Sequence, residues 1–323
     1  MNALVLSKEG IAYACVSQNT GKPPSLISCH FYPIDHPSET TSVLKQLVRE
    51  KKLENTAVVT SLKMGDTSLV KVEKPEVPAE EVRQAIRWKI KDSFSFSIDD
   101  AIVDVFEIPQ AKELGRASLV YVTAAEKSFL KQHIKLLEEE KLKVDSVDIA
   151  ELVLRNIAML LPEAEKGVVL LKFDQTQGLM TLVQNSSLYL ARNIDVGYKV
   201  LLENSLSRLD ENNEQEAPAE QALEQVLDMI VLEVQRSLDY YESHFSKPSI
   251  NSLVIAPMGR DISNITGYLT KALGLQVREL DFNDFLATEQ LISNEMQAKC
   301  CMAIGTALRN VEAVSAEDKG VAA

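Results

Sequence analysis

The sequence contains the same order of predicted elements twice, and this repeat restricts the fold more than any other feature. In each copy, three short apolar runs joined by turn residues precede an apolar-striped helix and a further strand. The C-terminal copy has expected strands at 168–173, 179–184, 188–193 and 252–256 and an expected helix at 221–245. The N-terminal copy has expected strands at 3–6, 11–17, 25–32 and 56–62 and an expected helix at 39–52. We therefore predict an internally duplicated α/β chain with two βββαβ halves.

Two βββαβ halves that face each other across a cleft resemble the architecture of the actin and sugar-kinase superfamily. In that superfamily the first hairpin turn of each half binds nucleotide phosphates through backbone N–H groups. We expect an actin-like fold made of two ribonuclease-H-like βββαβα halves. The chemistry of the two turns then decides whether the chain handles nucleotides.

A different pattern begins after Leu62 and predicts a small α+β module inserted into the first half. A helix is expected to start behind Pro78, because proline fits the first helical turn and the following glutamates favour a helix N-terminus. Module strands are expected at 67–72, 101–108, 118–123 and 144–147, with a second helix at 125–141. The expected division is a first half at 1–66 completed by 148–165 and a C-terminal helix at 294–312, the module at 67–147, a second half at 166–293 and a disordered tail at 313–323.

Charge and composition exclude several classes of partner. Lys and Arg number 34 and Asp and Glu number 47, which gives a net charge of −13 and repels nucleic acid and anionic lipid. The N-terminal apolar run is too short for a signal peptide, and no run approaches the ~20 apolar residues that span a bilayer. We expect a cytosolic protein with no nucleic-acid partner and no direct membrane insertion.

No pattern of cysteine or histidine predicts a metal site or a nucleophilic enzyme. The four cysteines lack CxxC spacing and are expected to be reduced, buried apolar residues. The four histidines are scattered, without the spacing of metal ligands and without a nucleophile elbow beside them. We therefore expect neither a bound metal nor hydrolase chemistry.

Three aromatic residues have two possible roles each. Trp88, the only tryptophan, lies away from the apolar stripe of the module's first helix. It is either packed under the loop at 95–98 or placed on a surface that faces a partner. Tyr240 and Tyr241 could stack on a base, but their place on an apolar helical stripe favours core packing. The acidic segment at 209–220 is expected to be a solvated loop rather than a switch.

Several segments, in their order along the chain, resemble the PilM family of type IV pilus assembly proteins. They are EVRQAIRW at 81–88, FSFSIDD at 94–100, VDV at 103–105, VDSVD at 144–148, ARNIDVG at 191–197, EVQRSLDYY at 233–241 and AIGTALR at 303–309. The resemblance covers about residues 1–310. Within the family it is strongest to the members that serve MSHA pilus systems.

The resemblance implies an actin-like scaffold on the cytoplasmic side of the bacterial inner membrane. PilM-like proteins bind the short N-terminal tail of a bitopic PilN-like protein, which in an MSHA system would be MshJ-like. They link the membrane platform to the secretion ATPases that drive the pilus. The family holds the tail in a groove between the first subdomain and the inserted module, and we expect Arg87, Trp88 and Phe96 to bind it.

The first and third nucleotide loops depart from the pattern of the family members that bind ATP. The first hairpin turn reads LSKEG at 6–10, which keeps Gly10 but lacks the aspartate that would help to organise Mg²⁺. The adenosine loop reads APMG at 256–259, where Gly259 remains but Pro257 has no N–H to donate. Both loops are therefore expected to be vestigial.

The second hairpin turn, DQTQG, keeps its acidic residue, Asp174, and ends at Gly178. The glycine that should follow closely is replaced by Gln175 or Thr176, so side chains crowd the place where backbone must approach a phosphate. We expect Asp174, Thr176, Gln177 and Gly178 to form a vestigial nucleotide loop. The connection from 195 to 221 is too short for the subdomain that usually closes over the base. We expect a catalytically silent scaffold with no catalytic residue, no metal and no bound cofactor.

Two alternatives belong to other classes of function. One is a working PilM-like ATPase in which Asp174 organises Mg²⁺ and the attacking water. The other is the cytoplasmic region of a type II secretion L-type protein, which shares the fold, would bind a secretion ATPase and continues into a transmembrane helix.

Overall fold

The computed structural model describes residues 1–18, 23–78, 80–91, 93–94, 96–109, 118–206 and 216–311. This chain divides into two compact units. The first comprises Met1–Tyr13 and Phe31–Ala150, and the second comprises Ala14–His30 and Glu151–Ala323. Among the described residues, no helix is both long enough and apolar enough to cross a bilayer. The predicted tail at 313–323 and the first part of the predicted acidic loop at 209–220 lie outside the described residues.

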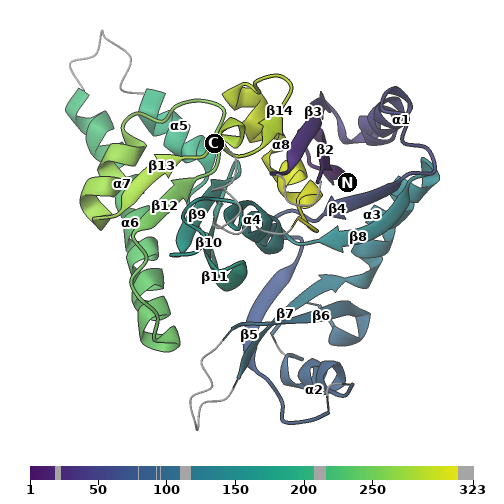
Figure 1. The fold of residues 1–323 in the computed structure, drawn as a ribbon, viewed down its shortest axis with the longest axis horizontal. Helices are drawn as coiled ribbons and strands as arrows, with labels where there is room; N and C mark the ends of the chain where they lie inside the picture. The colour runs from purple at the N-terminus through teal and green to yellow at the C-terminus, as the bar shows by residue number, and fades with distance from the viewer. Residues whose placement is uncertain are drawn as a thin grey trace. The chain divides into compact units, whose positions relative to one another are not determined.

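A six-stranded sheet contains the predicted N-terminal βββαβ pattern (Figure 1). Its strands are β1 (Asn2–Leu6), β2 (Gly10–Ser17), β3 (Ser25–Pro33), β4 (Ala57–Ser61), β8 (Lys143–Asp148) and β14 (Ala287–Thr288). Their order in the sheet is β14-β3-β2-β1-β4-β8. Strands β1, β4 and β8 run parallel, so their carboxyl ends lie at one edge, which is where open α/β sheets bind ligands.

One amphipathic helix follows the third strand of this pattern. The short 3₁₀ helix η1 (Pro37–Glu39) leads into α1 (Thr40–Glu50). Leu44, Leu47 and Val48 are buried on one side of α1, at the spacing of a helical stripe. The predicted helix at 39–52 is therefore confirmed, with slightly narrower ends.

The inserted module has a three-stranded antiparallel sheet of its own. The order is β5-β7-β6, with β5 (Ser68–Glu73), β7 (Leu119–Glu126) and β6 (Ala101–Glu107). Helix α2 (Val82–Lys89) lies beside this sheet in Figure 1, and the short 3₁₀ helix η2 (Ile98–Asp100) precedes β6. Ile86 and Ile90 are fully buried and belong to one apolar cluster with residues of β7, including Val122. This burial of apolar area stabilises the module.

Two elements that we assigned to the module belong elsewhere or begin later. The strand predicted at 144–147 is β8, which pairs with β4 in the six-stranded sheet rather than with a module strand. Strand β7 continues to Glu126, so α3 (Lys127–Glu139) starts two residues after the predicted 125. Strand pairing is a long-range property that local apolar content does not specify. The domain boundaries that we derived from the sequence stay a prediction.

The second unit contains a five-stranded sheet with the predicted meander at its centre and one edge. The order is β11-β10-β9-β12-β13, with β9 (Val168–Phe173), β10 (Gly178–Gln184), β11 (Ser187–Ile194), β12 (Ser252–Ile255) and β13 (Gln276–Glu279). Every residue of β9 and β10 is buried, which explains their continuous apolar runs. Asn185 and Ser186 both have positive φ, as a tight type I′ hairpin turn requires.

Helices of the second unit include one that the sequence did not predict. They are α4 (Ala150–Ala158), α5 (Tyr198–Leu206), α6 (Glu216–Phe245), α7 (Ile265–Leu273) and α8 (Asn294–Ala307), together with the short η3 (Phe282–Asp284). We treated the region of α5 as part of the connection from 195 to 221. Helix α7 ends at Gly274, which adopts the left-handed conformation that is typical of a glycine C-cap.

Candidate functional site

Two backbone N–H groups of the first hairpin turn form hydrogen bonds within the turn itself. Ser7 Oγ accepts hydrogen bonds from Glu9 N at 3.2 Å and from Gly10 N at 3.1 Å, and it donates to Gly10 O at 2.9 Å. Gly10 is needed for packing, because a Cβ there would overlap Tyr32 O and lie 2.5 Å from Phe31 Cζ. Two N–H groups of this turn are therefore already paired within the turn.

The second hairpin turn is closed onto helix α5. Asp174 N donates to Gln177 O at 2.8 Å. The carbonyl oxygens of Asp174 and Gln175 accept hydrogen bonds from Tyr198 N at 2.7 Å and Lys199 N at 3.1 Å, in the first turn of α5. The N–H groups of a helix N-terminus are a common binding place for an anion. Here two of them are occupied by the protein's own carbonyls.

A buried lysine lies beside the acidic residue of this turn. Lys172 Nζ is 3.2 Å from Asp174 Oδ1 and donates to Phe173 O at 2.7 Å. The Lys172 side chain is 9% exposed, whereas that of Asp174 is 43% exposed. Burial raises the pKa of the nearby Cys301 thiol to about 11, so this thiol is neutral at pH 7. Asp174 is therefore the acidic side chain that pairs with this lysine.

The glycines predicted for the nucleotide loops have structural reasons of their own. A Cβ at Gly178 would lie 2.9 Å from the Phe173 ring, and a Cβ at Gly259 would lie 3.3 Å from Ala298 Cβ. Gly259 also has a φ of +82°, which side chains rarely adopt. Thr176 is exposed in the same turn as Gly178. Within the described residues, no three His, Cys, Asp or Glu side chains gather as metal ligands.

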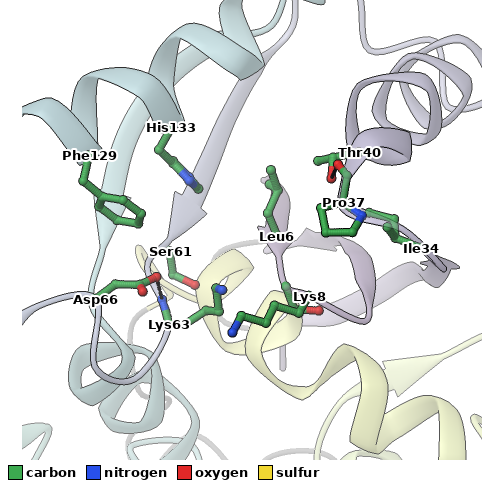
Figure 2. Close-up of a pocket in the computed structure, with 11 residues that line it drawn as sticks. Leu6, Lys8, Ile34, Pro37, Thr40, Ser61, Lys63, Asp66, Phe129 and His133 are labelled. Carbon is green, nitrogen blue, oxygen red and sulfur yellow. Dashed lines mark hydrogen bonds between the residues drawn. The ribbon is translucent and has the colours of Figure 1, made fainter.

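A cavity of about 210 Å³ lies in the first unit, at the carboxyl ends of β1 and β4. Figure 2 shows Phe129 and His133 of α3 on one side of it and Ile34, Pro37 and Thr40 on the other. The remaining lining residues come from the first hairpin and from the segment that follows β4. They are Leu6, Ser7, Lys8, Ser61, Lys63 and Asp66. Sequence reasoning missed this cavity, because its walls come from segments far apart in the chain.

The cavity combines apolar walls with a few polar groups. The Ser61 hydroxyl is buried and has no hydrogen-bond partner. His133 Nε2 lies 3.0 Å from Thr60 Oγ1, and burial lowers the pKa of His133 despite the opposing charge of Asp66. The imidazole is therefore neutral at pH 7. The lining therefore combines apolar surface with this imidazole, a buried hydroxyl and the side chains of Lys8, Lys63 and Asp66.

The three residues predicted to bind the partner tail occupy different environments in the module. Trp88 is 74% exposed, so the alternative that packs it under the following loop is wrong. Phe96 is half-buried and stacks on Phe94, with ring centroids 5.5 Å apart. The Arg87 guanidinium donates to the backbone carbonyls of Ile98 and, at 3.4 Å, of Ala101. Arg87 thus positions the segment before β6, whereas the Trp88 side chain is exposed on the surface of the module.

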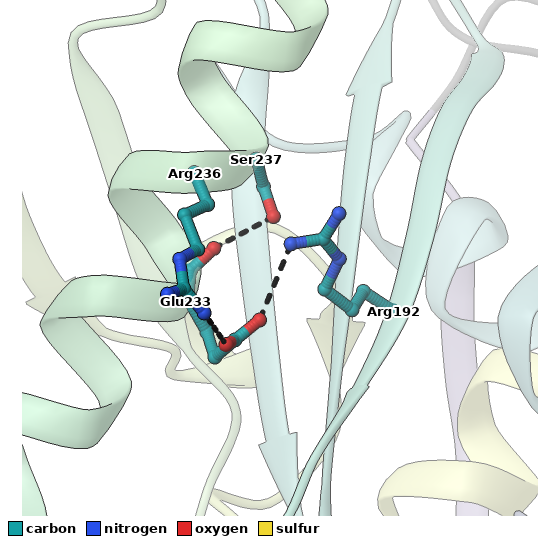
Figure 3. A network of polar contacts seen from close by, with 4 residues as sticks. All are labelled: Arg192, Glu233, Arg236 and Ser237. Atoms are coloured by element: carbon teal, nitrogen blue, oxygen red, sulfur yellow. Dashed lines mark hydrogen bonds and ion pairs between the residues drawn. The ribbon is translucent and has the colours of Figure 1, made fainter.

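Two of the sequence segments that carry the family resemblance meet in the second unit. Arg192 of β11 lies 3.2 Å from Glu233 of α6, and Arg236 lies 3.1 Å from the other oxygen of the same carboxylate (Figure 3). Ser237 Oγ donates to Glu233 O at 2.7 Å. One carboxylate therefore connects the sheet edge to the long helix, which gives these segments a structural role.

The family's sequence pattern decides the assignment. The sequence model described as Type IV pilus assembly protein PilM matches residues 32–311. The chain belongs to the PilM family. This PilM-family chain is similar in structure to a chain of a PilM-PilN type IV pilus biogenesis complex, with a TM-score of 0.74 and 20% identity over 96% of this chain and 98% of that chain. At this identity the likeness concerns the fold, and the predicted actin-like fold class is confirmed.

Other solved structures are similar over most of their length with lower scores. One is the cytoplasmic domain of EpsL from the type II secretion system of Vibrio cholerae, with 12% identity, coverage of 94% of each chain and a TM-score of 0.47. Another is a protein of actin-like ATPase fold and unknown function from Bacteroides thetaiotaomicron, with 11% identity, coverage of 93% and 95% and a TM-score of 0.46. No curated protein matches this sequence.

Proposed function

We propose that this PilM-family chain is a cytoplasmic scaffold that binds the N-terminal tail of a PilN-like inner-membrane protein. The proposal is carried by the structural likeness to a chain of the PilM-PilN complex over 96% of this chain. The exposed Trp88 and the partly apolar cavity of the first unit support a surface that recognises a peptide. Such a protein transmits position between its partners and performs no chemistry.

The tail binds in the groove between the first half and the inserted module. The cavity beside Phe129 receives an apolar side chain of the tail. The unpaired Ser61 hydroxyl forms one hydrogen bond with a polar group of the tail. Trp88 covers a further part of the tail, because an exposed tryptophan is a frequent anchor of binding energy. Arg87 acts indirectly by holding the segment before β6, and Phe96 supports that segment from the core side.

Within the family we assign the chain to the MSHA pilus branch, as a protein of the MshI type. The segments that carry the resemblance support this assignment. Its tail partner is then MshJ-like, and the scaffold connects the inner-membrane platform to the secretion ATPases. The net charge of −13 supports protein partners rather than nucleic acid or anionic lipid.

The chain is not an ATPase in this proposal, and its nucleotide loops are vestigial. Ser7 pairs the N–H groups of the first turn, and the second turn is closed on α5. The alternatives are an active ATPase that uses Asp174 and a type II secretion L-type protein. Thermal unfolding with Mg·ATP tests the ATPase alternative, because a ligand at 100 times its Kd raises the free energy of unfolding by about 2.7 kcal/mol. We expect no shift in melting temperature with Mg·ATP.

Calorimetric titration with a synthetic peptide of the partner's N-terminal tail tests the proposed function. We expect binding by the full chain and at least about tenfold weaker binding by Trp88→Ala and by Phe129→Ala. Ile102→Ala is the matched control, because Ile102 is 45% exposed in the same module outside the proposed groove. No heat of binding with folded wild-type protein would contradict the proposal.

A further inference from the structure

Lys172 is an unusual residue for its place in the fold. It lies in β9, a strand whose residues are all buried, and its side chain is 9% exposed. A buried ammonium is unfavourable unless hydrogen bonds and an opposite charge compensate it. Phe173 O at 2.7 Å supplies the hydrogen bond, and Asp174 Oδ1 at 3.2 Å supplies the charge.

We propose that the Lys172 ammonium is a permanent internal counter-ion of Asp174 and stands where an actin-like nucleotide site would need a divalent metal ion. An aspartate in this turn can bind Mg²⁺ only if its charge is available to the ion. Here a fixed positive charge already lies beside the carboxylate. A second cation at that position would be repelled by the first, and the turn does not fit the metal that the fold implies.

The backbone around Asp174 also leaves fewer N–H groups for binding a phosphate. The carbonyl oxygens of Asp174 and Gln175 occupy Tyr198 N and Lys199 N at the start of α5. Gly197 permits this close approach, because a Cβ there would lie 2.5 Å from Gln175 O and from Thr176 Cα. One oxygen of the Asp174 carboxylate and two N–H groups of α5 are therefore occupied from within the chain.

This arrangement has a consequence for regulation. The Lys172–Asp174 pair forms without any ligand, so we expect the turn to keep the same arrangement when metal or nucleotide is added. The inference rests on the proposed absence of nucleotide chemistry, but it concerns the metal and can be tested apart from the partner tail.

Manganese binding by the full chain tests this inference. Free Mn²⁺ is measured by electron paramagnetic resonance during titration of the wild type, Lys172→Met, Asp174→Asn and the double variant. We expect Lys172→Met to bind Mn²⁺ at least about tenfold more tightly than the wild type, and the double variant to lose the gain. Lys199→Met is the matched control, because Lys199 is an exposed lysine near the same turn. It is expected to bind Mn²⁺ as the wild type does.

Two results would overturn the inference. One is Mn²⁺ binding by the wild type that disappears in Asp174→Asn, and the other is a folded Lys172→Met that gains no binding. If Lys172→Met does not fold, denaturation of Lys172→Gln, Asp174→Asn and their double variant decides the matter. Internal pairing predicts that the double variant is less destabilised than the sum of the single variants, whereas additive losses contradict it. Failure of the tail titration leaves all these outcomes unchanged, so the two proposals fail separately.

Discussion

The Tyr241 hydroxyl donates a buried 2.8 Å hydrogen bond to Gln184 Oε1, which joins α6 to the central hairpin of the five-stranded sheet. Tyr241 is fully buried, and its ring meets that of Tyr189 edge to face, with centroids 5.4 Å apart. Burial raises the pKa of Tyr241, so the hydroxyl remains protonated and keeps its role as a donor. The predicted core packing of this tyrosine is confirmed, and base stacking is excluded for it.

Removing this hydroxyl tests the link between α6 and the sheet. Tyr241→Phe leaves the ring in place but deprives the buried Gln184 oxygen of its donor. We expect the free energy of unfolding to fall by about 1–3 kcal/mol, measured by chemical denaturation. A change smaller than about 0.5 kcal/mol, the size of an ordinary surface substitution, would show that the bond does not hold α6.

Gly197 tests the contact between the second hairpin turn and α5. In Gly197→Ala the new methyl group meets Gln175 O and Thr176 Cα at 2.5 Å, so the turn must move away from the helix. We expect a loss of about 2–4 kcal/mol in the free energy of unfolding. Gly274→Ala is the control: Gly274 has a φ of +68° but nothing within 4 Å of its Cβ position, and the expected loss is about 1–2 kcal/mol. Equal losses for the two variants would contradict the predicted contact.

The module offers a matched pair of substitutions on one helix. Ile86 is fully buried in the module core and Trp88 is 74% exposed, two residues along α2. We expect Ile86→Ala to destabilise the module by about 2–5 kcal/mol and to speed hydrogen exchange of its amides. Trp88→Ala should change the free energy of unfolding by less than about 0.5 kcal/mol. Loss of folding in Trp88→Ala would mean that the side chain packs against the chain and is not open to a partner.

His133 predicts a dependence of stability on pH. Burial lowers its pKa in the folded state from the ordinary 6.5, so the unfolded chain binds the proton more readily. The free energy of unfolding should therefore fall as pH drops below about 6.5, by up to about 1.4 kcal/mol per pH unit until the lowered folded pKa is reached. Denaturation at pH 7.5 and pH 5.5 measures this fall. His133→Gln should reduce the fall, and an unchanged difference would assign it to other groups.

The succession of strands and helices along the chain in both halves followed from local features of the sequence. Continuous apolar runs bounded by turn residues predicted β9 at 168–173 with both its ends. They also predicted the two strands that pair as the β10–β11 hairpin. Each of these features depends on a few neighbouring residues, so it can be recognised in a short segment of the sequence.

The chemistry of the candidate sites depended on contacts between distant residues. The sequence showed that the phosphate turns were altered, but only the structure placed Ser7 Oγ on the N–H groups of the first turn and closed the second turn on α5. It also placed β8 beside β4, and it formed the cavity between α3 and the ends of β1 and β4.

The sequence by itself determined the duplicated order of elements, the altered turns and the family resemblance, because these are properties of short segments and of their succession. The tertiary structure alone decided that Lys172 pairs with Asp174 and that Trp88 is exposed. The physical reason is that burial and ion pairing depend on which segments the fold brings together, and local residue pattern does not contain that information.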